Sequence, residues 1–255
     1  MQTIQFSHSN GFGAKTYTYF LKQLQPYTIS CVEQFGHGSF PIKENWQEVA
    51  DELIQHIEQH QTKKVVGVGH SLGAAATLFA ANKRPDLFER IILIEPPIFG
   101  AKMRWLMWFS RLIGKKEHFM VTRARKRQRV FKSRAEAYTI FKEKRLFKSF
   151  DKNCFQDYID YGLKDTKDGV ELAFSPDVEA DVFMTNPTKL GKINLKMPAT
   201  FIYSEHYKTL QKPDIVWWEK TFRHQMEFIG FDGGHMFPLE KPKETAALIQ
   251  SIIKS

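Results

Sequence analysis

The chain has 255 residues, of which 42% are hydrophobic and 25% are charged, the composition of a globular protein large enough to bury its own core. Its two cysteines, Cys31 and Cys154, are too few for a disulfide scaffold or for a zinc site built from cysteines alone. The first residues lack the pattern of a secretory signal, and no apolar run is long enough to span a membrane. We therefore expect a cytoplasmic protein with neither a metal ion nor a cofactor.

The net charge of +9 is concentrated in one part of the chain. Residues 101–152 contain 17 Lys and Arg but only 4 Asp and Glu, whereas the rest of the chain contains 20 and 24. The basic character therefore belongs to one segment, and we expect the architecture to change near residue 100.

The first hundred residues alternate between strand-like and helix-like patterns. Short apolar or β-branched runs predict strands at residues 3–7, 27–33, 64–69 and 90–94. Apolar residues at helical spacing predict helices between them, at residues 15–24, 45–60 and 72–82. Apolar runs without alternation are typical of strands buried on both faces of a parallel sheet, and strands alternating with helices indicate βαβ units.

The next part of the chain shows little strand pattern and is rich in Arg, Lys, Phe and Tyr at helical spacing. The alternation returns after it, with strands at residues 199–204 and 225–231 and a final helix at 243–253. We therefore predict an α/β core made of residues 1–100 and 196–255, interrupted by a helical insertion at residues 101–195.

A glycine-rich motif joins the strand at 64–69 to the helix at 72–82. Gly69, Ser71 and Gly73 form the pattern G-x-S-x-G, which between a strand and a helix predicts a nucleophile elbow. The sharp turn imposes strained dihedral angles on Ser71, and a side chain at either glycine would clash with the adjacent strand and helix. The turn exposes the Ser71 hydroxyl at a helix N-terminus, where backbone N–H groups favour a developing anion.

Four segments resemble motifs of the α/β-hydrolase fold family, in the family's chain order. They are the elbow, HSNGFG at residues 8–13, QFGHGS at residues 34–39 and GGHMFPLEKP at residues 233–242. In the second loop Gln34 stands where the family usually has Asp. The resemblance implies an α/β fold with a mostly parallel central sheet flanked by helices, a helical cap inserted after the family's sixth strand, and no first hairpin.

His235 follows a strand and two glycines, at the position where the resemblance places the catalytic base. A serine hydroxyl is a weak nucleophile until such a base takes its proton. His8, His37 and His70 fall on loops at the same edge of the predicted sheet, and we expect them to form structural hydrogen bonds.

The acid of the triad has more than one candidate. Most family members carry an Asp after the seventh strand, where this chain has Tyr207, but some place the acid after the sixth strand, which here ends at Glu95. We favour Glu95 because a charged residue at the end of a buried strand requires a partner. Glu205 is the alternative acid, followed by Asp232 or by no acid at all.

The resemblance implies acyl transfer through an acyl-enzyme, with Ser71 as the nucleophile and His235 as the base. The N–H of Leu72 and one from the loop at residues 8–13 would hold the oxyanion. The second donor is Phe12 in one alignment of that loop with the family, and Asn10 in the other.

The predicted cap begins with an aromatic stretch that contains Trp105 and Trp108. This stretch either packs the cap onto the sheet or forms a substrate-binding wall, which would favour an apolar substrate. The basic run from Arg123 to Arg129 is either a solvated helix, a clamp for an anionic substrate or a contact with an acidic membrane surface. Nucleic acid is the weakest alternative, since no known binding motif accompanies the run.

These observations predict a serine hydrolase that cleaves a small-molecule carboxylic ester, with no nucleic-acid partner and no transmembrane segment. A thioesterase, amidase, C–C hydrolase or lyase of the same fold is the first alternative. A non-catalytic ligand-binding or signalling protein on this scaffold is the second, because the usual aspartate is missing.

Overall fold

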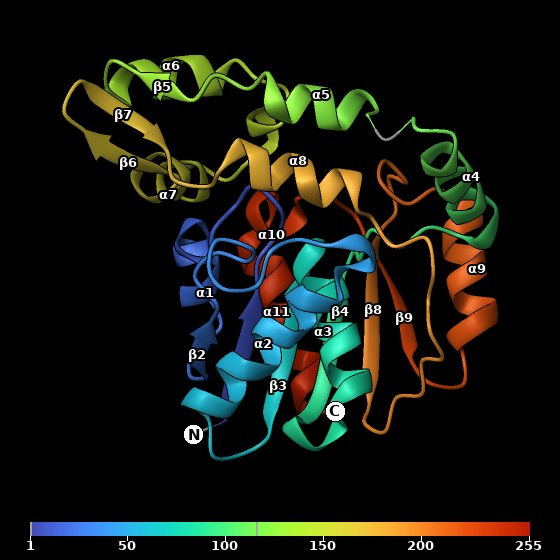
Figure 1. Ribbon diagram of the computed structural model, residues 1–255. Coiled ribbons are helices and arrows are strands. Elements are labelled where there is room, and N and C mark those ends of the chain that lie inside the picture. Colours follow the sequence, from blue (N-terminus) through green and yellow to red (C-terminus); the bar gives the residue numbers. More distant parts are fainter. Residues whose placement is uncertain (1, 116) are drawn as a thin grey trace.

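The structure is a computed structural model that describes residues 2–115 and 117–255. A six-stranded sheet forms its centre, in the order β2-β1-β3-β4-β8-β9, and every neighbouring pair of strands is parallel (Figure 1). The strands are β1 (Thr3–Ser7), β2 (Thr28–Cys31), β3 (Val65–His70), β4 (Phe88–Ile94), β8 (Ala199–Ser204) and β9 (Glu227–Phe231). The predicted mostly parallel central sheet is confirmed.

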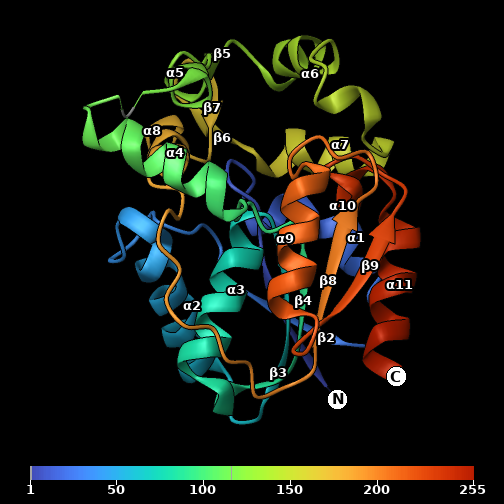
Figure 2. The same ribbon diagram turned by 90° about the vertical axis from the view of Figure 1, so that its right-hand side faces the viewer.

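Helices cover both faces of this sheet (Figure 2). One face carries α2 (Gln47–His60), α3 (Leu72–Lys83) and α9 (Lys212–Phe222), and the other carries α1 (Thr18–Lys22) and α11 (Pro242–Lys254). Shorter helical segments lie at Ala14–Tyr17, Glu44–Trp46, Pro85–Leu87 and, as α10, at Phe237–Glu240. Both faces of the central strands are thereby buried, which explains the unbroken apolar runs of β3 and β4.

Parallel pairing brings the carboxyl ends of the strands to one edge of the sheet. The chain leaves this edge after Ser7, His70, Ile94, Ser204 and Phe231. The loops that follow these residues therefore lie side by side, although they are far apart in the sequence. This is the edge at which open α/β sheets form their ligand sites.

The helices and short strands between β4 and β8 form a layer across this edge, at the top of Figure 1, and the chain after them returns along the sheet to the start of β8. Residues 101–195 are hereafter the cap segment. Its helices are α4 (Ala101–Leu112), α5 (Phe119–Arg125), α6 (Arg134–Lys142), α7 (Lys152–Tyr161) and α8 (Pro176–Met184), with a further helical turn at Phe147–Ser149. Among the described residues, no helix of the cap segment or the core is both long and apolar enough to cross a bilayer.

The predicted helical insertion is mostly helical in the structure, but the cap segment also contains a small antiparallel sheet, which the sequence analysis did not predict. Its strands β5 (Val130–Phe131), β6 (Leu163–Thr166) and β7 (Gly169–Leu172) pair in the order β5-β7-β6. Strands of two to four residues are too short for an alternating pattern to be read. The pair Asp168-Gly169, at the turn between β6 and β7, is the one local signal for this hairpin.

The cap segment is attached to the core at several points. Helix α7 packs against α1 and the helical turn before it, and the Tyr19 N–H donates to the Asp157 carboxylate. At the start of α8, the Ser175 N–H donates to His37 Nε2 at 3.0 Å. These contacts hold the cap segment over the edge of the sheet where the predicted site lies.

Candidate active site

Ser71 occupies the turn between β3 and α3, with a φ of 55° and a ψ of −117°. A positive φ is strained for a residue that carries a side chain. The turn is held by the Ser71 N–H, which donates to the Ile94 carbonyl at 2.8 Å, and by the Gly73 N–H, which donates to the His8 carbonyl at 3.1 Å. These bonds fix Ser71 at the carboxyl edge of the sheet.

Close approach of backbone to backbone explains the two glycines of the motif. A Cβ atom added to Gly69 would lie 2.3 Å from the Gly73 carbonyl oxygen, and one added to Gly73 would lie 2.1 Å from that of Ser7. Both separations are far inside van der Waals contact. Helix α3 can therefore start this close to β1 and β3 only with glycine at both positions.

Ser71, His235 and Glu95 form a continuous hydrogen-bonded chain. His235 Nε2 lies 3.1 Å from Ser71 Oγ, and His235 Nδ1 lies 3.1 Å from Glu95 Oε2. Because a carboxylate oxygen can only accept, Nδ1 carries the proton of the neutral ring, and Nε2 is left to accept from the serine hydroxyl. The three side chains predicted to act together are thus brought together by the ends of β3, β4 and β9.

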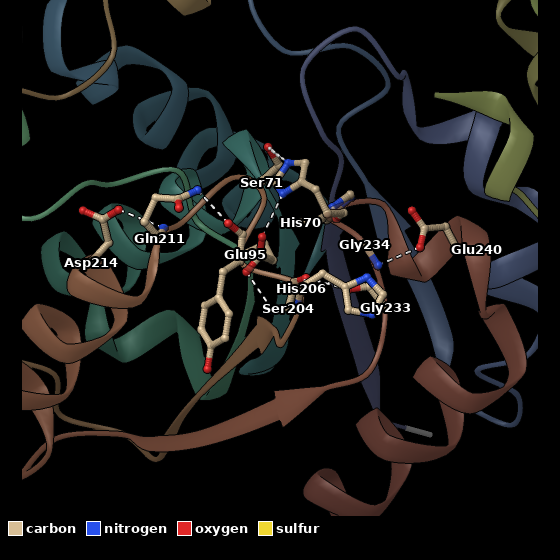
Figure 3. Close-up of polar contacts among 12 residues, drawn as sticks. His70, Ser71, Glu95, Ser204, His206, Gln211, Asp214, Gly233, Gly234 and Glu240 are labelled. Carbon is tan, nitrogen blue, oxygen red and sulfur yellow. Dashed lines mark hydrogen bonds and ion pairs between the residues drawn. The ribbon is translucent and has the colours of Figure 1, made fainter. Parts of the chain in front are cut away.

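Glu95 directly follows β4, with a φ of 51°, and is only 1% exposed. Its second oxygen, Oε1, accepts the Ser204 N–H at 2.8 Å, so both carboxylate oxygens have a partner (Figure 3). The Ser204 hydroxyl in turn donates to the Gly233 carbonyl at 2.5 Å. The end of β8 therefore holds both the acid and the loop that carries His235.

The other acids considered lie outside this chain of hydrogen bonds. Glu205 is exposed, and its carboxylate lies against the backbone of Gly230. Asp232 pairs with Lys241 at 2.8 Å and with His206 at 3.0 Å. The structure brings neither residue to His235.

His70 supports the loop of His235 from the buried side. Its Nε2–H donates to the His235 carbonyl at 2.9 Å, so its Nδ1 is free to accept the Tyr17 hydroxyl proton at 2.7 Å. The Tyr17 oxygen also accepts the Ser9 N–H at 3.4 Å. Burial lowers the pKa of His70 to about 3, with a further contribution from the nearby His235, so the ring is neutral at pH 7.

His8 and His37 also form structural hydrogen bonds, as expected. His8 Nδ1–H donates to the Ser9 carbonyl at 2.9 Å, and its Nε2 accepts the Phe35 N–H at 3.0 Å. His37 Nδ1–H donates to the Phe35 carbonyl at 3.0 Å, while the other ring nitrogen, Nε2, accepts the Ser175 N–H. Burial lowers the pKa of His8 to about 4 and lowers that of His37 as well.

The loop after β1 lies beside the Ser71 turn, but Phe12 does not offer a free N–H there. The Phe12 N–H donates to the Ser9 carbonyl at 3.3 Å across a turn in which Gly11 has a φ of 77°. The Asn10 N–H makes no hydrogen bond within the described part of the chain. Leu72 is the first residue of α3, so its N–H has no acceptor within the helix. The geometry therefore favours the N–H of Asn10 over that of Phe12 as the second donor, beside Leu72, of the expected oxyanion hole.

A largely buried cluster of the cap segment, which the sequence did not predict, covers this loop. Arg127 Nη1 pairs with Glu179 Oε2 at 2.5 Å, and its Nη2 donates to the Tyr158 hydroxyl. The Glu179 carbonyl accepts from Asn10 Nδ2 at 3.0 Å, and the Tyr158 ring centroid lies 5.2 Å from that of Phe12. The cluster thus contacts both sides of the turn at Gly11. The partner of Arg127 lies 52 residues further along the chain, among other acidic residues.

Two further arginines of the basic run are paired within the cap segment. Arg125 pairs with Glu117, and Arg129 forms a two-pronged pair with Asp177 at 2.7 and 2.8 Å. These two arginines therefore form ion pairs at the surface of the protein.

Trp105 and Trp108 do not lie at the triad. They are 58% and 40% exposed, on the surface of α4, and line a shallow hollow of about 220 Å³ together with Arg104, Thr188 and Lys189. The expectation that they pack the cap onto the sheet is wrong, and the structure does not bring them to Ser71. Exposure of a helix face depends on tertiary packing, which the aromatic pattern alone does not reveal.

Within residues 2–115 and 117–255, no group of three or more His, Cys, Asp and Glu side chains is placed to hold a metal ion. The cluster at the edge of the sheet combines a hydroxyl, an imidazole and a carboxylate. That combination suits nucleophilic attack by the serine.

Comparison with known proteins agrees with this fold. The sequence profile of the alpha/beta hydrolase family matches residues 6–248. The chain belongs to the α/β-hydrolase family. Membership of this family supports a hydrolase.

Individual relatives of this α/β-hydrolase are distant. Ethanol acetyltransferase 1 of Kluyveromyces lactis is 32% identical over 73 residues, which are 29% of this chain and only 20% of that protein's length. E-2-(acetamidomethylene)succinate hydrolase superposes with a TM-score of 0.82 at 17% identity, covering 100% of this chain and 92% of its own. The thioesterase domain of a curacin biosynthetic pathway superposes with a TM-score of 0.74 at 17% identity, covering 98% and 91%. At these identities the two solved structures show the shared fold alone.

The close approach at Gly73 predicts a large effect of one methyl group on stability. Gly73→Ala should lower the free energy of unfolding by about 3 kcal/mol, because the added Cβ meets backbone that cannot move aside. Gly191→Ala is the matched control, since an added Cβ there has no atom within 4 Å. Urea denaturation of both variants measures the difference. Equal stabilities would contradict the described contact between α3 and β1.

The buried histidines predict that stability falls in mild acid. His8 and His70 are neutral in the folded chain, whereas an unfolded histidine takes a proton below about pH 6.5, so acid favours the unfolded state. Each residue should lower the free energy of unfolding by about 2 kcal/mol between pH 7 and pH 5. Urea denaturation at both pH values measures this. His70→Gln should remove its share of the pH dependence, whereas the exposed His60→Gln should retain it. A full pH dependence in His70→Gln would contradict the assignment.

Proposed function

We propose that this α/β-hydrolase is a serine hydrolase that cleaves a carboxylic ester through an acyl-enzyme. The observation that carries the proposal is the contact chain in which His235 lies 3.1 Å from both Ser71 Oγ and Glu95 Oε2. These distances are within reach for proton transfer from a serine to a base that a carboxylate orients. A non-catalytic protein would have no need of a buried carboxylate aimed at this imidazole.

In the proposed first step, Ser71 Oγ attacks the carbonyl carbon of the ester while His235 Nε2 takes the hydroxyl proton. Glu95 holds the imidazole in the required tautomer and stabilises the imidazolium that forms. The tetrahedral intermediate then breaks its bond to the leaving alkoxide, which receives the proton from Nε2. Water repeats the sequence on the acyl-enzyme, with His235 again as base, and releases the carboxylic acid and the free serine.

We assign the oxyanion hole to the N–H groups of Leu72 and Asn10. Leu72 lies at the N-terminus of α3, where the helix dipole adds to its own N–H. The contact between Gly73 and the carbonyl groups of Ser7 and His8 supports the assignment of Asn10, because it keeps the loop beside the elbow. Preorganised donors of this kind stabilise the charge that develops in the transition state.

The proposed substrate is a small-molecule ester with an apolar acyl part. Aromatic side chains of the cap segment surround Phe12, next to the proposed oxyanion hole, with ring centroids of Phe147, Phe150 and Tyr158 at 5.2–6.3 Å. An apolar group suits such surroundings better than a charged one. The two free thiols, Cys31 and Cys154, are compatible with the proposed cytoplasmic location, where thiols stay reduced.

The hydrolysis of p-nitrophenyl butyrate tests this proposal. We expect Ser71→Ala to lose at least about 1,000-fold in kcat/KM, because the nucleophile is gone. Glu95→Gln should lose about 1,000-fold, because a neutral amide neither fixes the productive tautomer nor stabilises the imidazolium.

Glu205→Gln is the matched control for the acid and should stay within about twofold of the wild type, since surface changes away from a site have small effects. Equal losses in the two glutamate variants would contradict the assignment of Glu95. Undiminished hydrolysis by Ser71→Ala would contradict the proposed mechanism as a whole.

A further inference from the structure

Helix α4 of the cap segment has its polar and apolar sides reversed. Arg104 and Arg111 lie about two helical turns apart and face the body of the protein. Their guanidinium groups donate to the backbone carbonyls of Phe99 and Asn186 at 2.6 and 2.8 Å. Trp105, Phe109 and Leu112 face away and are 43–66% exposed. A surface helix of a globular protein normally presents these faces the other way round.

Exposed apolar side chains continue along the chain from α4 to the start of α5. Of the 14 large hydrophobic side chains exposed in the described chain, nine lie between Met103 and Met120, and α4 contains no buried residue. The Trp105 and Phe109 rings stack against each other, with centroids 5.7 Å apart, so the surface is aromatic and ordered. A concentration of exposed apolar groups on one element marks an interaction site.

The charges around this surface are almost all positive. Residues 101–126 contain eight Lys and Arg but a single acidic residue, Glu117. Exposed Lys102, Lys115, Arg123 and Lys126 form no ion pair with a carboxylate of the described residues. The surface therefore combines Trp and Phe with uncompensated cations, which is the composition of helices that lie in the interface of an anionic membrane.

We propose that the outer face of α4 and the beginning of α5 bind an anionic phospholipid surface, with α4 lying parallel to the membrane plane. The aromatic and aliphatic side chains would enter the boundary of the acyl chains, and the surrounding lysines and arginines would contact the phosphates. Association is peripheral, and it does not depend on the proposed hydrolase activity.

A second copy of the chain fits this surface less well than lipid does. A twofold symmetric dimer brings the same surface patch of both subunits together, so each cluster of cations would face its own copy. Like charges held together in that way repel one another, whereas phosphates neutralise them. The excess of positive charge therefore favours the lipid surface.

Co-sedimentation with lipid vesicles tests the proposal. Wild-type protein should partition at least about tenfold more strongly onto vesicles of phosphatidylcholine mixed with phosphatidylglycerol than onto phosphatidylcholine alone, and added salt should weaken this binding. The double variant Trp105→Ser/Phe109→Ser should lose at least about tenfold. Lys115→Gln/Lys126→Gln should lose about tenfold on the anionic vesicles only.

The double variant Tyr161→Ser/Val216→Ser is the matched control, because it removes two exposed apolar side chains from α7 and α9. It should bind like the wild type, and so should Ser71→Ala, which separates this proposal from the proposed catalysis. Thermal unfolding of each variant verifies that it is folded.

Three results would overturn the proposal. They are equal binding to neutral and anionic vesicles, undiminished binding by Trp105→Ser/Phe109→Ser, and a dimer in solution that this variant converts to a monomer. The last result would assign the surface to a second copy of the chain.

Discussion

The backbone turn at Ser71 is the constraint on which the site depends. It places a residue with a side chain at a φ of 55°, a conformation that most side chains avoid. The surrounding structure holds it there through bonds from the elbow to Ile94 and His8 and through two glycines that allow backbone to touch backbone. Because the turn ends a central strand of a parallel sheet, the loops after the neighbouring strands converge on it.

A network of buried polar groups then fixes the loops relative to one another. The Ser9 N–H, the Tyr17 hydroxyl and the His70 ring form one path from the loop after β1 to the loop that carries His235. Ser204 joins that second loop to Glu95. Satisfied buried networks of this kind rigidify a structure, so Ser71, His235 and Glu95 are held in position. The low pKa of His70 keeps this support uncharged.

The sequence predicts those parts of the site that follow from local motifs and the parallel sheet. Ser71 and Glu95 each follow a strand directly, and His235 lies on the loop after β9, so the topology brings all three to one edge. The choice between Phe12 and Asn10 as the second oxyanion-hole donor depends on the turn at Gly11. The sequence motif does not predict the dihedral angle of this turn. The contact of Arg127 with Glu179 joins residues 52 positions apart, and no periodic pattern of the sequence predicts it. Likewise, the outward direction of the Trp105 side chain depends on the tertiary hydrogen bonds of Arg104 and Arg111, which turn the opposite face of α4 toward the protein.

Covalent labelling tests the central claim most directly, because it requires a serine activated by its neighbours. A fluorophosphonate probe should modify the wild-type chain at a single residue, and peptide mass spectrometry should place that residue at Ser71. His235→Ala should react far more slowly, since no base then takes the hydroxyl proton. A wild-type chain that stays unlabelled, or labelling that persists in Ser71→Ala, would contradict the claim that this turn presents an activated nucleophile.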